Sequence, residues 1–198
     1  PKRVTANSGI DAATHLIEAF ITWRATPISH GLTMSGIELI GKYLRRAYDD
    51  GNDIEAREGM SAAALLGGMA FANSGLGAAH GIGMAVGIAY NVPHGEACGI
   101  MLPHVMKLNA PHALPKMARI GELLTGKKFA AEQEAADAAV DFIFELCAHM
   151  GIKPDFKHLN IPKEEIPALA KASFGTSMSS NPVQLTQEQW EEYFTTIM

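Results

Sequence analysis

Cysteine is scarce in this sequence, which has two, Cys98 and Cys147, among 198 residues. They form no CxxC pair and supply no disulfide framework, a pattern typical of a reducing compartment, so we expect a cytoplasmic location. Cys98 follows His94 by four residues and would face the same pocket if this segment is helical. We favour the simpler interpretation, that Cys98 is a small buried apolar residue.

The sequence also lacks a cluster of basic residues and an apolar leader. The net charge is −5, and lysine and arginine are scattered, which excludes a typical nucleic-acid-binding surface. The opening residues PKRVTANSG contain no apolar core of a signal peptide. A chain of this length fits one domain that buries roughly 70% of the surface of its unfolded form.

Charged residues are missing between Glu58 and Glu96. The stretch is long enough that a transmembrane helix must be considered. It is interrupted by glycines and by Asn73, Asn91 and Pro93, and no run of large aliphatic residues has the required length. We therefore expect a helical hairpin buried by its neighbours, and no membrane span.

Helical periodicity is present along the whole chain, and no alternating strand pattern of useful length appears. We predict a single all-α domain over residues 1–198. Ser8 and Asp53 are expected N-caps, residues 29–32 a connection, and Thr186 an imperfect capping box because Glu188 follows it by two residues instead of three. The expected helices span roughly residues 8–23, 37–50, 53–74, 80–90, 94–109, 114–124, 130–150, 163–173 and 186–198.

Four side chains form a candidate metal centre. Asp11 and His15 are four residues apart, so on a helix both lie on one face. His80 and His94 lie in the uncharged stretch, where burial without a partner costs free energy. One carboxylate and three imidazoles suit a divalent transition metal. The alternatives are a surface hydrogen bond for the helix pair and hydrogen-bonded core histidines for the other two.

Two other kinds of cofactor site are excluded, because the sequence lacks the motifs that they require. Gly75-x-Gly77 has His80 in place of the third glycine of a dinucleotide-binding turn, and no strand precedes it. A helical di-iron carboxylate site needs paired Glu-x-x-His motifs, and no glutamate here has a histidine three residues later.

The segments GIDAATHLIEAFIT and GLGAAHGIGMAVGIAYNVPHGEACGIMLPHVMKLN resemble the helical C-terminal half of iron-containing (group III) alcohol dehydrogenases. The resemblance covers most of the chain, and its most specific part is a histidine followed fourteen residues later by another in Pro-His-Gly. It implies the dehydroquinate synthase-like helical fold of that domain.

The resemblance implies a function as well. Asp11, His15, His80 and His94 would bind Fe²⁺, or Zn²⁺ as in some members, and the cation would polarise the oxygen of a small alcohol or aldehyde during hydride transfer. NAD(P) would bind an N-terminal α/β domain that this chain lacks, so we expect no turnover by the chain alone. A homo-oligomer is left open.

Two further positions concern the substrate pocket. Phe71 matches an aromatic position that lines it in the family, although an ordinary core phenylalanine is an equal alternative. Met84 stands where many members carry a second histidine near the nicotinamide, and methionine cannot relay a proton. This departure weakens any assignment of the substrate by analogy.

Alternative functions are a glycerol dehydrogenase-like member of the superfamily, a dehydroquinate synthase-like lyase, and an isolated helical metal-binding or interaction domain without turnover. The lyase uses fewer histidines in a different ligand set, so the Asp11/His15 pair disfavours it.

Overall fold

A computed structural model describes all 198 residues, which fold into nine α-helices and four short 3₁₀ turns without a β-strand. The all-α prediction is therefore confirmed. In chain order the helices are α1 (Lys2–Ile21), α2 (Pro27–Asp49), α3 (Ile54–Ser74), α4 (Ala78–Tyr90), α5 (His94–Asn109), α6 (Leu114–Thr125), α7 (Glu132–His149), α8 (Ile166–Ser173) and α9 (Gln187–Ile197).

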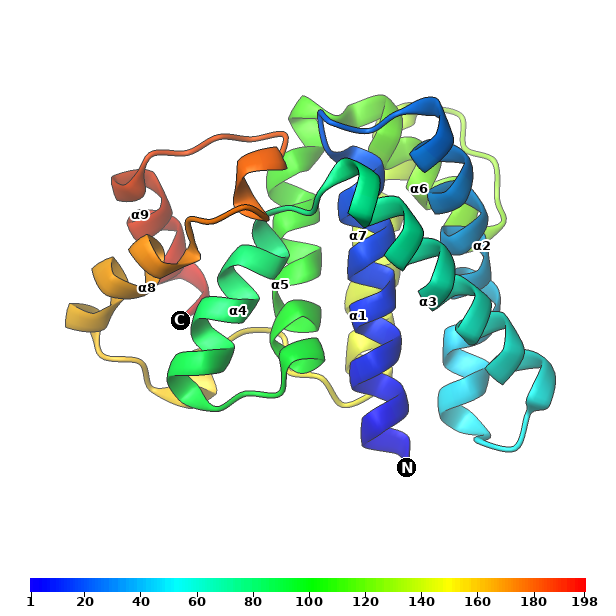
Figure 1. The fold of residues 1–198 in the computed structure, drawn as a ribbon, viewed down its shortest axis with the longest axis horizontal. Helices are drawn as coiled ribbons and strands as arrows, with labels where there is room; N and C mark the ends of the chain where they lie inside the picture. Colours follow the sequence, from blue (N-terminus) through cyan, green and yellow to red (C-terminus); the bar gives the residue numbers. More distant parts are fainter.

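Helix α1 is the central element. It lies between α4 and α5 on one side and α2 and α3 on the other (Figure 1), and it contacts all four as well as α6. Small residues lie among the aliphatic ones around α1, so neighbouring helices can pack on several of its faces. A Cβ on Gly9 would lie 2.2 Å from Leu44 Cδ1, so the glycine lets α2 approach closely.

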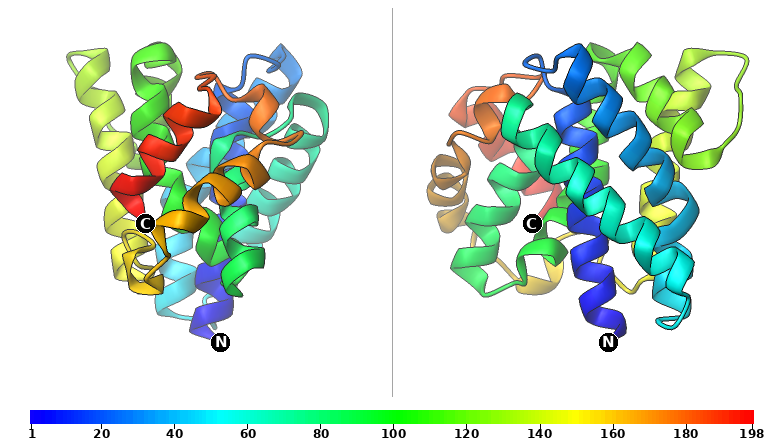
Figure 2. Two further views of the ribbon diagram at one scale, coloured as in Figure 1. Left: turned by 90° about the vertical axis from the view of Figure 1, so that its left-hand side faces the viewer. Right: turned by 45° about the vertical axis from the view of Figure 1, so that its right-hand side comes forward.

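The C-terminal helices form a separate layer over α4. Helix α8 packs against both α4 and α9. Figure 2 shows α8 and α9 on the side of the molecule away from α2 and α3. Trp190 and Phe194 bury one face of α9 and join the main core. This layer leaves the start of α5 and the adjoining part of α1 uncovered, where a cavity of about 330 Å³ lies between the two helices.

Two predicted helix starts are wrong. Helix α1 begins at Lys2 instead of Ser8, and the Ser8 hydroxyl donates to the Val4 carbonyl within the helix, 2.8 Å away. Residues 29–32 are helical instead of a connection. Helix α2 already begins at Pro27, because Thr26 and Ser29 form a capping box at its N-terminus.

Other boundaries follow the prediction closely. Asp53 caps α3 by accepting from the Ala56 amide at 3.0 Å, and α5 spans the predicted residues 94–109. The capping box at Thr186 is complete, contrary to expectation, because its partner is Gln189. Gln189 follows Thr186 by three residues, which is the spacing that a capping box requires.

The uncharged stretch is less buried than predicted. Exposed fractions are 65% for Leu65, 48% for Met69 and 79% for Ile88. The reason is that α3 packs on α1 and α2, and α4 on α5 and α8, which leaves a further face of each helix open to solvent. No single helix is long and apolar enough to cross a membrane; α3 and α4 pass such a test only as a pair, and they are bent by 104°.

We predict that Gly121→Ala destabilises the fold, because a Cβ there would lie 1.9 Å from the Ala135 carbonyl oxygen of α7. The expected loss is about 1–3 kcal/mol of unfolding free energy, measured by urea denaturation. Gly31→Ala in α2 is the control: apart from the neighbouring backbone of α2 itself, no atom lies within 4 Å of the added Cβ, so it should stabilise by up to about 1 kcal/mol. Equal effects of the two substitutions would contradict this account of the α6–α7 contact.

Candidate metal centre

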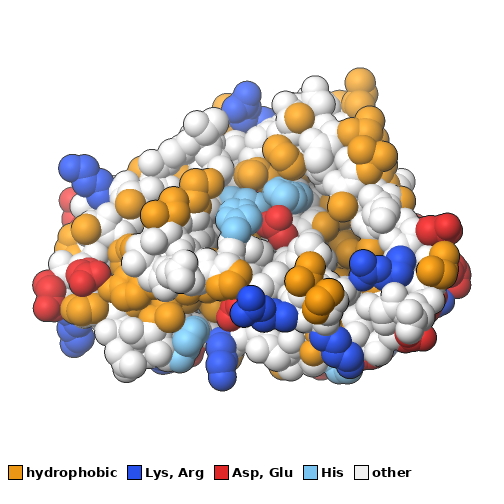
Figure 3. Space-filling view, turned by 60° about the horizontal axis from the view of Figure 1, so that its bottom comes forward, with side chains coloured by type: hydrophobic (Ala, Val, Ile, Leu, Met, Phe, Trp, Pro, Cys, Tyr) orange, Lys and Arg blue, Asp and Glu red, His pale blue; other side chains and the backbone are white.

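Three helices bring the predicted ligands together. Helix α1 presents Asp11 and His15 on one face, α4 supplies His80 in its first turn, and α5 begins with His94. Viewed from the uncovered lower end, histidine side chains gather around an acidic side chain in a hollow of the surface (Figure 3). The predicted convergence of the two distant sequence segments is therefore present in the structure.

The donor atoms lie at short distances from one another. Asp11 Oδ1 is 3.5 Å from His80 Nε2 and 3.4 Å from His94 Nε2. His15 Nδ1 is 4.0 Å from Asp11 Oδ2, and the His15 ring stacks on the ring of His80 with centroids 4.6 Å apart.

Two of these donor atoms are buried and have no hydrogen-bond partner, namely Asp11 Oδ1 and His80 Nε2. An unpaired buried carboxylate oxygen or ring nitrogen costs free energy, so such atoms point to a missing partner. A divalent cation between them would satisfy both. The residues present therefore fit a metal ion by their chemistry.

The exposure of His94 differs from the prediction that both histidines of the uncharged stretch are buried. His80 is buried, but the His94 side chain is 48% exposed. It is the first residue of α5 and lines the cavity of about 330 Å³ between this helix and α1. The centre is consequently closed by protein on the His80 side and open on the His94 side.

Glu18 is a functional residue that the sequence analysis missed. Its carboxylate is buried and lies 2.6 Å from His80 Nδ1. The same carboxylate accepts from the Gly77 amide at 3.0 Å and from the Ala79 amide at 2.6 Å. It thus caps the N-terminus of α4 and holds His80 with Nδ1 protonated, leaving Nε2 free to accept a cation.

A sequence signal for Glu18 was available. It follows Asp11 by seven residues and His15 by three, so it continues the same face of α1. Its neighbours Ile17 and Ala19 are apolar, and all three are buried. A carboxylate in such a segment requires a buried partner, but its partner belongs to α4 and lies 62 residues away.

The C-terminal segment also fixes the start of α4. Asn181 accepts from the Ala78 amide at 3.2 Å and exchanges two side-chain hydrogen bonds with Asn109 of α5, at 2.9 and 3.0 Å. Both asparagine side chains and Ala78 are buried. Together with Glu18 this satisfies the first amides of α4, so the position of His80 is fixed from two sides.

The charges of the centre are strongly coupled. Burial lowers the pKa of His80, but the carboxylates of Glu18 and Asp11 outweigh burial and raise its pKa to about 9. Burial would raise the pKa of Asp11, yet the close contact with His80 and the charges of the nearby imidazoles lower it. Burial and the charge of His80 lower the pKa of His15. A cation can replace the proton that His80 otherwise holds.

Cys98 lies in the same centre, as its spacing from His94 suggested. It is fully buried, as we also expected, and its Sγ atom is 3.6 Å from His94 Nε2. The ligand atoms of Asp11, His80, His94 and Cys98 all lie within 4.8 Å of one another. His15 falls outside this group of four, although it contacts two of its members.

The two predicted pocket residues lie on either side of the centre. Phe71 stacks on His15 with ring centroids 4.7 Å apart. Met84 is 47% exposed and, with Ile88 and His94, lines a cavity of about 150 Å³. Both are therefore adjacent to the histidine cluster.

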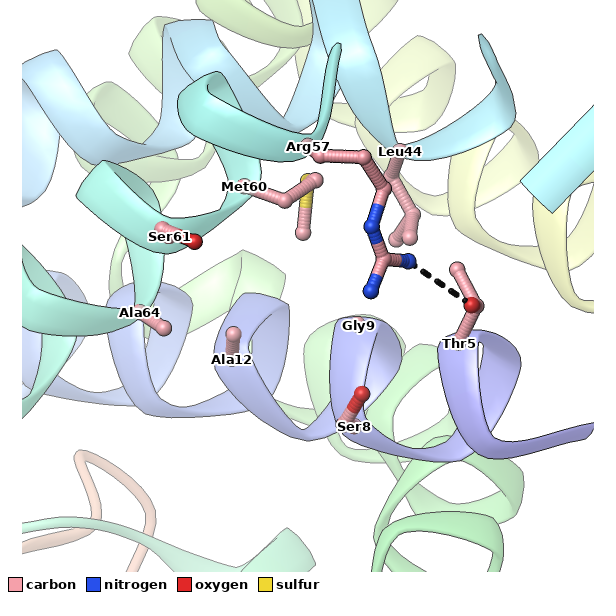
Figure 4. Close-up of a pocket in the computed structure, with 9 residues that line it drawn as sticks. All are labelled: Thr5, Ser8, Gly9, Ala12, Leu44, Arg57, Met60, Ser61 and Ala64. Atoms are coloured by element: carbon pink, nitrogen blue, oxygen red, sulfur yellow. Dashed lines mark hydrogen bonds between the residues drawn. The ribbon is translucent and has the colours of Figure 1, made fainter. Parts of the chain in front are cut away.

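A separate cavity of about 170 Å³ lies between α1 and α3 (Figure 4). In it Arg57 reaches from α3 to α1 and donates to Thr5 Oγ1 at 3.0 Å. None of the predicted site residues lines this cavity.

Comparison with known proteins identifies the family of this chain. A family model described as Fe-containing alcohol dehydrogenase family, C-terminal, matches residues 5–198. The chain belongs to this family. It is 35% identical over its whole length to alcohol dehydrogenase 4 of Schizosaccharomyces pombe and covers 46% of that protein. Identity to lactaldehyde reductase of Escherichia coli is 37% over 99% of this chain and 51% of that one.

Solved structures of family members share the fold. The crystal structure of a 1,3-propanediol oxidoreductase superposes with a TM-score of 0.94 at 34% identity, covering 99% of this chain and 52% of the other. A sulfoacetaldehyde reductase from Bifidobacterium kashiwanohense, solved in complex with NAD+, gives a TM-score of 0.89 at 27% identity, covering 100% and 50%. The chain thus spans about half the length of the relatives it matches.

We predict that Glu18→Gln flattens the pH dependence of stability in the metal-free protein. The folded pKa of His80, about 9, exceeds the ordinary value of 6.5, so its contribution is complete below pH 6.5 and is lost as pH rises through 9. That contribution is roughly 3 kcal/mol at most. Without the Glu18 charge, unfolding free energies measured by urea denaturation with a chelator present should change less between pH 6.5 and 9.

Glu38→Gln is the control for this prediction, since Glu38 is exposed on α2. It should leave the slope of unfolding free energy against pH unchanged. A Glu18→Gln slope equal to that of the unmodified chain would show that Glu18 does not set the charge state of His80.

Proposed function

We propose that this chain is the metal-binding half of an NAD(P)-linked alcohol dehydrogenase that also reduces aldehydes. The observation that carries the proposal is the pair of buried atoms without partners, Asp11 Oδ1 and His80 Nε2, which face each other at 3.5 Å. Family membership supports it, because the relatives are named as alcohol dehydrogenases, a lactaldehyde reductase and 1,3-propanediol dehydrogenases.

Asp11, His15, His80 and His94 would hold the ion. Imidazole and carboxylate donors accept Fe²⁺ and Zn²⁺ alike, so their affinity alone does not select iron. Iron is our first choice because the family is described as Fe-containing, and Zn²⁺ is the second. When bound, the ion supplies Lewis acidity that stabilises negative charge on the oxygen of the alcohol or aldehyde.

Three residues beside the proposed ligands would orient a ligand or contact the substrate. Glu18 orients His80, as its 2.6 Å contact with Nδ1 requires. The open side at His94 admits the substrate, and Phe71 and Met84 would pack against its carbon atoms. Met84 has no proton to donate, so the alcohol proton must be transferred by another group.

The nicotinamide cofactor would be held mainly by a second, NAD(P)-binding half. Support comes from the relatives, of which this chain covers about half, and from the sulfoacetaldehyde reductase solved with NAD+. The substrate would be a small alcohol or aldehyde bound between the two halves. On this view the chain alone binds metal without turning over substrate.

We predict that the chain binds one equivalent of Zn²⁺ or, under anaerobic conditions, Fe²⁺. Loss of a hydrogen-bond partner of a metal ligand weakens metal binding by roughly 10–100-fold. Asp11→Asn removes a proposed ligand itself, so it should weaken metal binding by more than this. Equilibrium dialysis with metal analysis measures the change. His149→Ala is the control, since His149 pairs with Asp49 at the surface, 2.7 Å away. Unchanged binding by Asp11→Asn would remove the metal centre from the proposal.

Turnover provides a second test. Fused to the N-terminal half of lactaldehyde reductase from Escherichia coli, the metal-loaded chain should oxidise NAD(P)H in the presence of small aldehydes. The unfused chain should not, because hydride chemistry belongs to the cofactor. A fusion that binds both metal and NAD(P)H, yet reduces neither aldehydes nor glycerol-derived ketones, would favour a metal-binding domain without turnover.

A further inference from the structure

The cavity between α1 and α3 contains a positive charge that no acidic side chain balances. Arg57 extends from α3 across the cavity toward Thr5 and Gly9 of α1 (Figure 4). Arg46 and Arg119 pair with carboxylates elsewhere in the structure, whereas no carboxylate oxygen lies within 4.0 Å of the Arg57 guanidinium. No aspartate or glutamate lines the cavity. An anion from outside the chain would supply the missing partner.

Most hydrogen-bond donors in this cavity are unused. A guanidinium carries five N–H groups, and Arg57 uses one of them, from Nη1 to Thr5 Oγ1 at 3.0 Å. The hydroxyls of Thr5 and Ser61 line the same cavity, and each has an O–H to donate. The Ser8 hydroxyl, in contrast, already donates to the Val4 carbonyl at 2.8 Å. The cavity therefore offers several donors and no charged acceptor.

The cavity also has room for a ligand. Its volume is about 170 Å³, enough for several water molecules. On the α1 side it is lined by Gly9 and Ala12, whose small size keeps the space open. Arg57 is exposed, so a ligand reaches it from solvent. Thr5 ends the first turn of α1, which has no acidic residue, so the positive end of the helix dipole adds to the charge of Arg57.

We propose that this cavity is an oxyanion site, in which Arg57 binds inorganic phosphate or a phosphate monoester through two parallel N–H···O bonds. The hydroxyls of Thr5 and Ser61 donate to the remaining oxygens. Asp11 follows Thr5 by six residues, or roughly 9 Å along the axis of α1, so the anion lies apart from the metal centre. The site needs no metal ion and does not rest on the proposed function.

The shape of arginine favours this proposal over a simple link between the two helices. A single bond to a hydroxyl requires only one neutral donor. A rigid planar fork of donors is suited instead to two oxygens of one phosphate group, which lysine, as a point charge, cannot match in the same way. Arginine and lysine at position 57 should therefore differ in phosphate binding although their charge is equal.

Titration with inorganic phosphate tests the site on the metal-free chain, where no bound ion competes for the anion. Nuclear magnetic resonance at constant ionic strength should show a saturable shift of the Arg57 side-chain Nε–H signal, which Arg57→Lys identifies by its loss. The signal of Arg45, which is exposed on α2 and does not line the cavity, should stay in place. An Arg57 signal that does not respond to phosphate overturns the oxyanion site and leaves the proposed metal centre standing.

Substitutions give an independent measurement by calorimetry. Arg57→Ala should weaken phosphate binding at least ~10-fold, because charge-assisted hydrogen bonds are lost. Arg57→Lys should weaken it by less, and it also provides the test if Arg57→Ala does not fold. Arg45→Ala, which removes the same charge from α2, should leave the affinity unchanged. Equal affinities of Arg57→Ala and the unmodified chain, or equal losses in Arg57→Ala and Arg45→Ala, contradict the proposal.

Glycerol 3-phosphate distinguishes the two sources of the anion. Binding of this monoester more tightly than inorganic phosphate, with the gain abolished by Arg57→Ala, supports a phosphorylated metabolite as the ligand. Equal or weaker binding supports the free ion. Binding of neither anion overturns the site.

Discussion

The carboxylate of Glu18 is the contact on which the centre depends. It is buried, caps the first amides of α4 and holds His80 by Nδ1. A buried carboxylate is tolerated only where donors surround it, and the N-terminus of a helix supplies such donors together with a favourable dipole. One side chain of α1 therefore fixes both the position of α4 and the orientation of the histidine that α4 carries.

This arrangement explains why the centre is asymmetric. His80 is fixed from behind by Glu18, and the start of α4 is tied to Asn181 and through it to Asn109 of α5. His94, in contrast, begins α5 at the uncovered end of the bundle and is half exposed. A site closed by protein on one side and open on the other fits the proposal that a substrate and an NAD(P)-binding half approach the centre from outside.

Glycines set the distances between the helices that meet here. Gly83 allows α4 to lie against the backbone of Cys98, and a Cβ on Gly95 would lie 2.1 Å from the Asn7 carbonyl oxygen of α1. Because the three helices approach so closely, a thiol, a carboxylate and two imidazoles from separate segments share one small volume.

The sequence alone determined the fold class, most helix boundaries and the Asp11/His15 pair, because helical spacing is a local property. The uncharged stretch made His80 and His94 candidates, and the family resemblance implied that all four side chains are ligands. Only the tertiary structure showed that Glu18 contacts His80 and the first amides of α4, which belong to another helix, and that the His94 side chain is half exposed. Burial and contact depend on which faces of the helices meet, and periodicity within one segment cannot specify the neighbour that another segment provides.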